Sequence, residues 1–272
     1  FDELYLFDTK DFFIDGTFAT AKDEIHSFVE IINQSKFDLT INISFTKSSS
    51  YLTSLIDSPV KFGMQRNNKT EVVINDKWSQ FVFSNTMNHH YNPFSFVDIY
   101  RYIMGVNETL VLDPDPNFEK RNKNIVIHPF ASQRKKKWGL NKWNELIFKL
   151  AKDNPDYHFH IVGGPEDQQE ANRLINSPAM ANIKDRITNM AGKGQISDVY
   201  QLLNDAKLFI GHDSMVSHLA SEALTPAIII SLGVVRPNET TPYSNKVINV
   251  SPRNSCFPCS PSDKCELLPC HG

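Results

Sequence analysis

Apolar and polar residues alternate along the first part of the chain as expected of strands joined by amphipathic helices. The pattern predicts strands over residues 4–8, 37–43 and 60–64, and helices near 21–34, 48–56 and 94–104. Strands that alternate with helices of this length predict βαβ units and a parallel sheet. Residues 65–92 are polar and follow neither period clearly, so they stay unassigned.

A second and clearer series begins at Asn124. It predicts strands over 124–128, 157–162, 207–210, 227–231 and 246–250 with one near 187, and helices over 141–152, 167–175, 197–204 and 214–224. The stretch Asp113-Pro114-Asp115-Pro116-Asn117 separates the two series and has the composition of an interdomain linker. We therefore predict an α/β fold with Rossmann-like open-sheet domains over 1–117 and 118–255, and a cysteine-rich tail over 256–272. Because the chain opens on Phe1 and not on Met, we expect the first domain to be incomplete at its N-terminus.

The turn between strand 207–210 and helix 214–224 carries the most chemical information. Asp213 or Ser214 is a suitable N-cap, with a side-chain oxygen that can accept backbone N–H groups of the first turn. Such a helix start favours anions, because it carries a partial positive charge of roughly half a unit. His218 and Glu222 continue a polar row from Ser214 along one face of the helix. An ordinary capped helix with one core histidine would show the same pattern.

Composition narrows the class of protein. The 272 residues are 40% hydrophobic and 22% charged, a normal balance for a globular protein. The formal net charge of -3 excludes a nucleic-acid binder that works through a broad basic face. No apolar run is long enough to span a bilayer. We predict a cytoplasmic protein, either free or peripheral to the inner membrane.

Four motifs of the second series occur in a distinctive order. They are His128-Pro129-Phe130-Ala131-Ser132 followed by Lys136-Lys137-Trp138, Val162-Gly163-Gly164-Pro165-Glu166, Ala191-Gly192, and Gly211-His212-Asp213-Ser214 with His218-Leu219-Ala220. Their order and spacing resemble glycosyltransferase family nine, the ADP-heptose:lipopolysaccharide heptosyltransferases. The resemblance is strong over residues 124–250 and fainter over 1–115, where Lys36-Phe37-Asp38-Leu39, a serine-rich turn and Lys61-Phe62-Gly63 carry it.

The resemblance implies a GT-B fold of two facing Rossmann-like domains. The second domain would bind a nucleotide-sugar donor and the first a lipid-linked or core oligosaccharide acceptor, with inversion at the anomeric carbon and no catalytic metal. The implied substrate-binding residues are Ser132, Lys136, Glu166, Asp213, Ser214, Met215 and His218. Lys136 would neutralise phosphate with Ser132 beside it, and Glu166 would bind the ribose. The remaining residues would face the diphosphate and the donor sugar.

These roles agree with the chemistry of the reaction. As the nucleotide leaves, the sugar becomes oxocarbenium-like, so fixed cations and N–H donors near the leaving phosphate lower the barrier. Lys136 and the helix start at Ser214 could supply both. The alternatives are a solvated basic loop over 134–138, a simple tight turn over 163–166, and a purely capping role for Asp213.

The chain departs from the family pattern at two places. Met215 stands where the family usually has glycine, and its side chain would narrow the approach of a phosphate to the backbone. The family's general base is an aspartate in a glycine-containing loop after the first strand, and that loop is not in this sequence. Asp8, Asp11 and Asp15 would be guesses for the base, which therefore stays unassigned.

All four cysteines lie near the end of the chain. Cys256, Cys259, Cys265 and Cys270 could hold zinc or iron at a structural tetrahedral site, with His271 as a substitute ligand. Only the first pair has a common metal-site spacing, so disulfides or unpaired thiols are equal alternatives.

Together these observations predict an inverting glycosyltransferase that moves heptose from ADP-heptose to a lipopolysaccharide core or related envelope acceptor. The first alternative is a catalytically impaired homologue or partner subunit that binds the nucleotide-sugar, which the missing loop and Met215 favour. The second is a nucleotide-sugar epimerase on the same two-domain fold.

Overall fold

The computed structural model describes residues 3–6, 18–88, 92–106, 118–244, 246–259 and 265. The chain forms two compact units. The first comprises residues 1–92 and 96–108, and the second comprises residues 93–95 and 109–272. Each unit combines a sheet with helices, in keeping with the alternation of the sequence.

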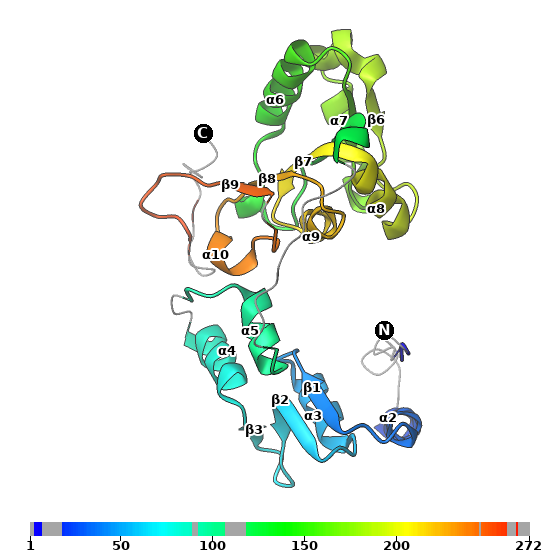
Figure 1. Ribbon diagram of the computed structural model, residues 1–272, viewed down its shortest axis with the longest axis vertical. Helices are drawn as coiled ribbons and strands as arrows, with labels where there is room; N and C mark the ends of the chain where they lie inside the picture. Colours follow the sequence, from blue (N-terminus) through cyan, green and yellow to red (C-terminus); the bar gives the residue numbers. More distant parts are fainter. Residues whose placement is uncertain are drawn as a thin grey trace. The chain divides into compact units, whose positions relative to one another are not determined.

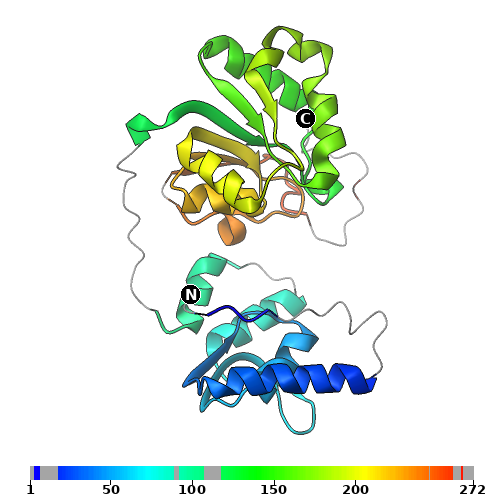
Figure 2. The same ribbon diagram turned by 90° about the vertical axis from the view of Figure 1, so that its right-hand side faces the viewer.

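The first unit contains a sheet of three strands. Its elements are α2 (Phe18–Gln34), β1 (Leu39–Asn42), α3 (Lys47–Leu55), β2 (Val60–Arg66), β3 (Val72–Ile74), α4 (Lys77–Asn88) and α5 (Phe96–Ile103). Strand β1 pairs with β2 in parallel, and β3 pairs with β2 in the antiparallel sense. Helix α2, dark blue in Figure 2, is fastened to the turn after α3 by Asn33, whose Oδ1 accepts the Asp57 N–H at 2.8 Å.

One prediction for the first unit was wrong, and one stretch left unassigned contains regular structure. The strand predicted over 4–8 is absent at residues 4–6, where Leu4 and Leu6 are exposed and no paired strand forms, and residues 7 and 8 lie outside the described part. The stretch 65–92, which the sequence left unassigned, contains β3 and α4. Asp76 begins α4 by accepting the Ser79 N–H at 2.7 Å, a capping signal that the polar composition concealed.

Glycine is required where β1 meets β2. Gly63 pairs with Asn42 and has a φ of 85°, which L-residues rarely adopt. A Cβ at this position would lie 1.9 Å from the Asn42 carbonyl oxygen. The Asn42 amide also donates to the Met64 carbonyl at 2.7 Å, so side chain and backbone both hold the two strand ends together.

The core of the first unit is small and aromatic. Val82, Ile99 and Ile103 are buried between α4 and α5, and aromatic side chains of both helices and of the sheet pack around them. Trp78 stacks on Tyr102 with ring centroids 4.7 Å apart. Aromatic pairs of this kind supply much of the buried area in a small unit.

The second unit is built on a six-stranded parallel sheet (Figure 1). Its strands are β4 (Asn122–His128), β5 (His158–Ile161), β6 (Ile187–Asn189), β7 (Ala206–His212), β8 (Ala227–Ile230) and β9 (Val247–Val250). Its main helices are α6 (Leu140–Asp153), α7 (Gln168–Ile175), α8 (Ile196–Asp205) and α9 (Met215–Glu222), with the short α10 (Pro237–Thr240) before β9. The spatial order β6-β5-β4-β7-β8-β9 is that of a doubly wound nucleotide-binding fold. The order in which strands are added to the sheet reverses between β4 and β7.

Alternating side chains of the central strand point into two cores, one on each face of the sheet. Ile125 and Ile127 pack with Trp143 of α6 and Leu174 of α7, whereas Val126 packs into the core that α8 and α9 complete. A strand buried on both faces has a continuous apolar run in its sequence, which is why β4 was identified readily. The predicted strands and helices of this series are confirmed within one or two residues at most ends.

Arg121, immediately before β4, connects the sheet to its helices at the amino end of β4. The side chain is buried, and its guanidinium donates to the carbonyls of Leu203 (2.9 Å), Ala206 (3.2 Å) and Ala223 (2.6 Å) and to the Thr225 hydroxyl (3.1 Å). One side chain therefore joins the end of α8, the start of β7 and the end of α9.

We expect Arg121→Leu to lower the free energy of unfolding of the protein by about 3 kcal/mol, because the buried carbonyls of Ala206 and Ala223 and the Thr225 hydroxyl lose a charged donor. Lys123→Met is the matched control. It replaces a cation two positions along the chain, on β4, that is 59% exposed and pairs with Asp156 on the surface, so its effect should stay within about 0.5 kcal/mol. Urea denaturation followed by fluorescence would measure the free energy of unfolding of both variants. Equal losses in the two variants would contradict this role of Arg121.

Candidate functional site

A cavity of about 1000 Å³ lies at the carboxyl ends of the strands of the second sheet. Its walls come from the connections that follow β4, β5, β6 and β7, with Thr240 of α10 added, and all of its lining residues belong to the second unit. Ligands of open α/β sheets bind in this place, where the strand order reverses. The predicted site residues Ser132, Lys136, Glu166, Asp213, Ser214, Met215 and His218 all line the cavity.

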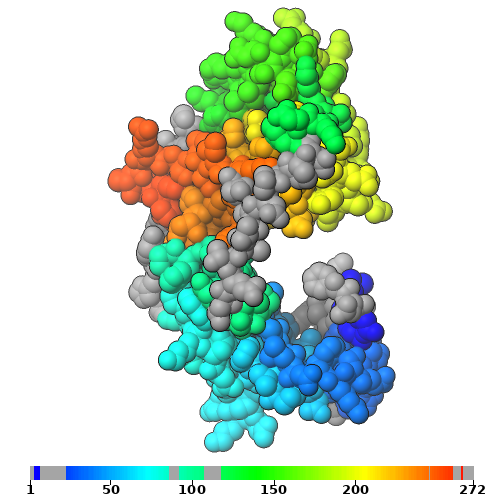
Figure 3. Space-filling view, viewed as in Figure 1, coloured from blue at the N-terminus to red at the C-terminus, as the bar shows by residue number. Residues whose placement is uncertain are grey.

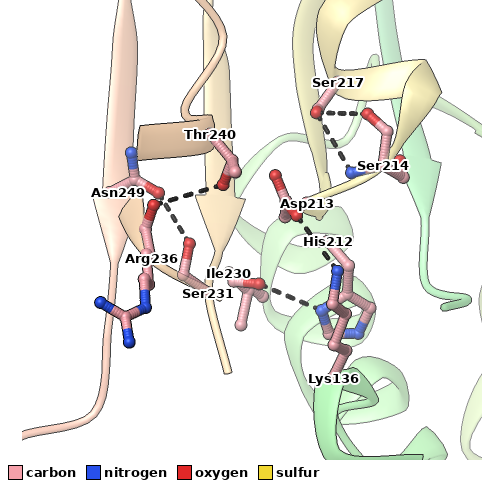
Figure 4. A network of polar contacts seen from close by, with 10 residues as sticks. All are labelled: Lys136, His212, Asp213, Ser214, Ser217, Ile230, Ser231, Arg236, Thr240 and Asn249. Carbon is pink, nitrogen blue, oxygen red and sulfur yellow. Dashed lines mark hydrogen bonds and ion pairs between the residues drawn. The ribbon is translucent and has the colours of Figure 1, made fainter. Parts of the chain in front are cut away.

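Lys136 and Asp213 face each other in this cavity (Figure 4). Lys136 ends a short 3-10 helix, η2 (Arg134–Lys136), and Asp213 follows β7. The lysine Nζ lies 3.4 Å from Asp213 Oδ2, and the two side chains are 23% and 12% exposed. The ammonium group is thus held beside the start of α9.

Ser214, one of the two predicted caps, is the N-cap residue of helix α9, but its side chain makes no capping hydrogen bond. Instead, Ser217 Oγ accepts the Ser214 N–H at 3.3 Å and donates to the Ser214 carbonyl at 2.6 Å. The Ser214 hydroxyl oxygen is buried and has no hydrogen-bond partner in the described structure. Buried hydroxyls nearly always have a partner, so this group has capacity left for a ligand.

His212, the last residue of β7, joins the two sides of the cavity. Its Nε2 lies 3.0 Å from the Trp138 backbone nitrogen and its Nδ1 lies 3.1 Å from the Ile230 carbonyl oxygen. The ring is 1% exposed and meets the Trp143 ring edge-on at 88°. Nothing in the sequence alone distinguished this histidine from the rest of its motif.

The turn Gly163-Gly164-Pro165-Glu166 is both a tight turn and a wall of the cavity. Asp167 Oδ2 accepts the Gly164 N–H at 3.0 Å and closes the turn. A Cβ on Gly164 would lie 2.4 Å from the Glu166 carboxylate, so glycine lets this carboxylate fold over the turn. Asp167 was not predicted as a site residue, although an acidic residue three positions after a turn start is a capping signal.

The remaining predicted residues lie on exposed parts of the wall. His218 is exposed on α9, so the alternative of a core histidine is wrong. Met215 is 56% exposed at the first position of α9. The basic run is only partly a solvated loop, because Lys137 also lines the cavity and pairs with Glu170 at 3.0 Å.

His128, at the end of β4, contributes a buried imidazole to the cavity. Its Nδ1 lies 2.9 Å from the Val162 carbonyl oxygen, and its ring meets Phe130 edge-on. Burial lowers the pKa of His128, and the Val162 hydrogen bond and the nearby carboxylates of Asp167 and Glu166 only partly oppose this effect. Burial therefore favours the neutral form of the ring in the folded protein.

The cysteines do not assemble into a metal centre within the described residues. Cys256 is exposed, Cys259 is buried with its N–H on the Gly233 carbonyl at 2.8 Å, and Cys265 is partly buried. No three candidate ligands are grouped closely enough in the described part of the chain to hold a metal ion. Residues 251–258, at the orange-red end of the colour bar, lie on the surface (Figure 3). Cys270 and His271 lie outside the described residues, so the metal stays a prediction.

A doubly wound unit with a cavity at its strand-order reversal, and with a helix start and a lysine in that cavity, is typical of a nucleotide-binding enzyme domain. Residues 25–268 match the sequence profile of glycosyltransferase family 9 (heptosyltransferase). The chain belongs to this family and is a glycosyltransferase. Lipopolysaccharide heptosyltransferase 3 of Escherichia coli is 23% identical over 243 residues, which are 85% of this chain and 70% of that protein.

Solved structures share the fold. The ADP-heptose lipopolysaccharide heptosyltransferase II of E. coli matches with a TM-score of 0.62 at 16% identity, over 85% of this chain and 73% of that one. The E. coli heptosyltransferase WaaC with ADP matches with a TM-score of 0.55 at 19% identity, over 85% and 71% of the two chains. The predicted family and the α/β, GT-B-type fold class are confirmed.

The lowered pKa of His128 makes stability depend on pH in one direction. The unfolded chain takes up a proton near the ordinary histidine pKa of 6.5, whereas the folded protein resists it, so the stabilisation is complete above that pH and is lost as the pH falls below it. We expect the free energy of unfolding to fall more between about pH 7.5 and about pH 5.5 in the wild type than in His128→Gln.

The variant keeps a donor for the Val162 carbonyl and lacks the titration. His160, whose pKa is also lowered by burial, titrates in both proteins and cancels in the comparison. Urea titrations at the two pH values provide the measurement, and parallel curves would contradict the prediction.

Proposed function

We propose that this glycosyltransferase moves heptose from ADP-heptose to a lipopolysaccharide core or related envelope acceptor with inversion at the anomeric carbon. The observation that carries the proposal is the meeting of the Lys136 ammonium and the unpartnered Ser214 hydroxyl in one cavity at the start of α9.

Three groups at this place suit a pyrophosphate, namely the Lys136 ammonium, the Ser214 hydroxyl and the start of α9. The ammonium supplies a point charge, the hydroxyl can donate one hydrogen bond, and the helix start supplies backbone N–H groups and a partial positive charge. They lie on the connections after β4 and β7, the two strands that flank the reversal of strand order. A nucleoside diphosphate placed there would have its phosphates between the two connections.

The rest of the cavity suits the other parts of a nucleotide-sugar. Its volume of about 1000 Å³ is at the upper end of the usual range for ligand pockets, so a nucleotide and a sugar can fit together. Glu166 offers a carboxylate for the two ribose hydroxyls. Apolar side chains of Ile196, Val199 and Leu219 offer a surface for a flat base. The names of the fold relatives, which include ADP-heptose and lipopolysaccharide, support this choice of donor and acceptor.

In the proposed reaction an acceptor hydroxyl attacks the anomeric carbon of the donor. A new carbon–oxygen bond forms while the bond to the β-phosphate oxygen breaks, and the electron pair leaves with the nucleoside diphosphate. Lys136 and the start of α9 stabilise the charge on that oxygen. The acceptor proton passes to a base that we do not assign, since Asp8, Asp11 and Asp15 lie outside the described residues.

The place of the reaction in the cell stays a prediction. Among the described residues no helix combines the length and the apolar character needed to cross a membrane. The composition predicts a location in the cytoplasm, with the protein either free or peripheral to the inner membrane.

We expect Lys136→Ala to lower the rate of sugar transfer about 100-fold, because it removes a fixed cation from the leaving group. Lys149→Ala is the matched control, since Lys149 is exposed on α6, lies outside the cavity lining and pairs with Glu145 one turn away. Transfer is measured with a labelled donor and a deacylated core oligosaccharide, and the binding of ADP is measured separately.

The outcomes separate the candidate functions. Equal rates for the wild type and Lys136→Ala would reject the site. Donor binding without transfer by the wild type would favour the impaired homologue or partner subunit. Conversion of the donor in the absence of acceptor would favour the epimerase. If UDP or GDP bound more tightly than ADP, the proposed donor would be wrong and the family assignment would stand.

The predicted zinc or iron has its own test. Protein purified without added metal is analysed for its elements, and a four-thiolate site predicts close to one ion per chain that the double variant Cys256→Ser/Cys259→Ser loses. Absence of metal from the wild type would leave disulfides or unpaired thiols as the state of the cysteines.

A further inference from the structure

The His212 imidazole occupies a central place beside the cavity and has no role in the reaction proposed above. It is 1% exposed and does not line the cavity. Among the described residues, the ring joins the end of β7 to the end of β8 through Ile230 (Figure 4) and to the segment that follows η2 through Trp138.

The hydrogen bonds define the state of the ring. The backbone nitrogen of Trp138 can only donate, so Nε2 at 3.0 Å must be the acceptor. In the neutral ring the proton is then on Nδ1, which donates to the Ile230 carbonyl at 3.1 Å. His212 and Ile230 are also register partners in the sheet, so the imidazole extends the pairing of β7 with β8.

Two tryptophans fix the plane of the ring. Trp143, which is fully buried, meets His212 edge-on with centroids 5.4 Å apart, and Trp138 meets Trp143 edge-on at the same distance. A side chain held by two hydrogen bonds and an aromatic contact cannot move without disturbing all three segments.

The position of His212 in the sequence explains why its hydrogen bond with Trp138 matters for the site. Trp138 follows Lys136 by two residues, and His212 directly precedes Asp213 and Ser214. The bond from Trp138 to His212 therefore links the segment that carries the ammonium to the turn that carries the hydroxyl. Lys136 and Ser214 belong to different strand connections, and this bond holds the two connections at a fixed separation.

We propose that His212 is a positioning residue that sets the location of Lys136 relative to the start of α9. It does so through the Trp138 backbone and without touching the donor. The proposal deepens the proposed function and rests on it, because the two positioned groups are those assigned to the pyrophosphate. An imidazole suits the place because it offers one donor and one acceptor on a flat, apolar ring.

The test is a double-mutant cycle with inorganic pyrophosphate and ADP as probes. His212→Phe keeps a ring against Trp143 and removes both hydrogen bonds, whereas His212→Gln keeps one donor and one acceptor. We expect His212→Phe to weaken binding about tenfold in the wild-type background and less than about twofold in a Lys136→Met background. His212→Gln should recover most of the affinity.

Two further measurements separate positioning from general destabilisation. Met180→Ala enlarges the buried core next to α6 without touching the cavity, and serves as a control that lowers stability. It should leave probe affinity unchanged. Hydrogen exchange of the Trp138 amide should accelerate at least about tenfold in His212→Phe and not in Met180→Ala.

Each outcome decides the proposal. Equal losses of affinity in the two backgrounds, or an unchanged exchange rate at Trp138, would overturn it. If the wild type bound neither probe, the proposed function would fail, and the exchange rates would still decide whether His212 holds the segment. If His212→Phe did not fold, the cycle and the exchange would be measured with His212→Leu and His212→Gln, with the same criteria.

Discussion

The parallel pairing of β4 with β7 is the contact on which the rest of the second unit depends. Ile127 lies opposite Ile210, and His128 lies opposite Gly211. A Cβ on Gly211 would come within 3.0 Å of the His128 carbonyl oxygen and 2.5 Å of the Phe209 ring. Glycine therefore lets the two central strands stay together up to their carboxyl ends. From there the chain turns away on opposite sides of the sheet, and the space that opens between the connections is the cavity.

The chemistry of the site follows from this divergence. Each of the two central strands delivers one part of an anion site, a cation after β4 and a helix start after β7. Neither part is long or specific by itself, and basic loops and capped helices are common in proteins. Their value comes from being held at a fixed separation, because preorganised charges stabilise a developing charge without reorganisation during the reaction. The sheet sets that separation coarsely, and side-chain hydrogen bonds adjust it.

Much of the second unit could be predicted from the sequence and much less of the first. Strands buried on both faces leave continuous apolar runs and amphipathic helices leave a periodic signal, so β4 to β9 were found nearly in place. Strand β3 was left unassigned because it is only 3 residues long and lies among polar residues, and helix α4 because its own polar residues hide the period. The predicted site residues share one cavity because each follows a strand end. The role of Ser217 in place of Ser214 and the bonds of His212 could not be predicted, since they depend on the distances between segments far apart in the sequence.

The ion pair between Lys136 and Asp213 has a consequence for selectivity among small anions. A chloride or sulfate that approaches the ammonium meets a carboxylate already 3.4 Å from it, and so encounters repulsion together with attraction. Simple ions lack further contacts with which to outcompete that carboxylate. A ligand that also engages the neighbouring walls can share the lysine with Asp213 or displace the aspartate toward another part of the ligand. The pocket thereby discriminates against the abundant salts of its surroundings in favour of molecules large enough to reach several of its walls at once.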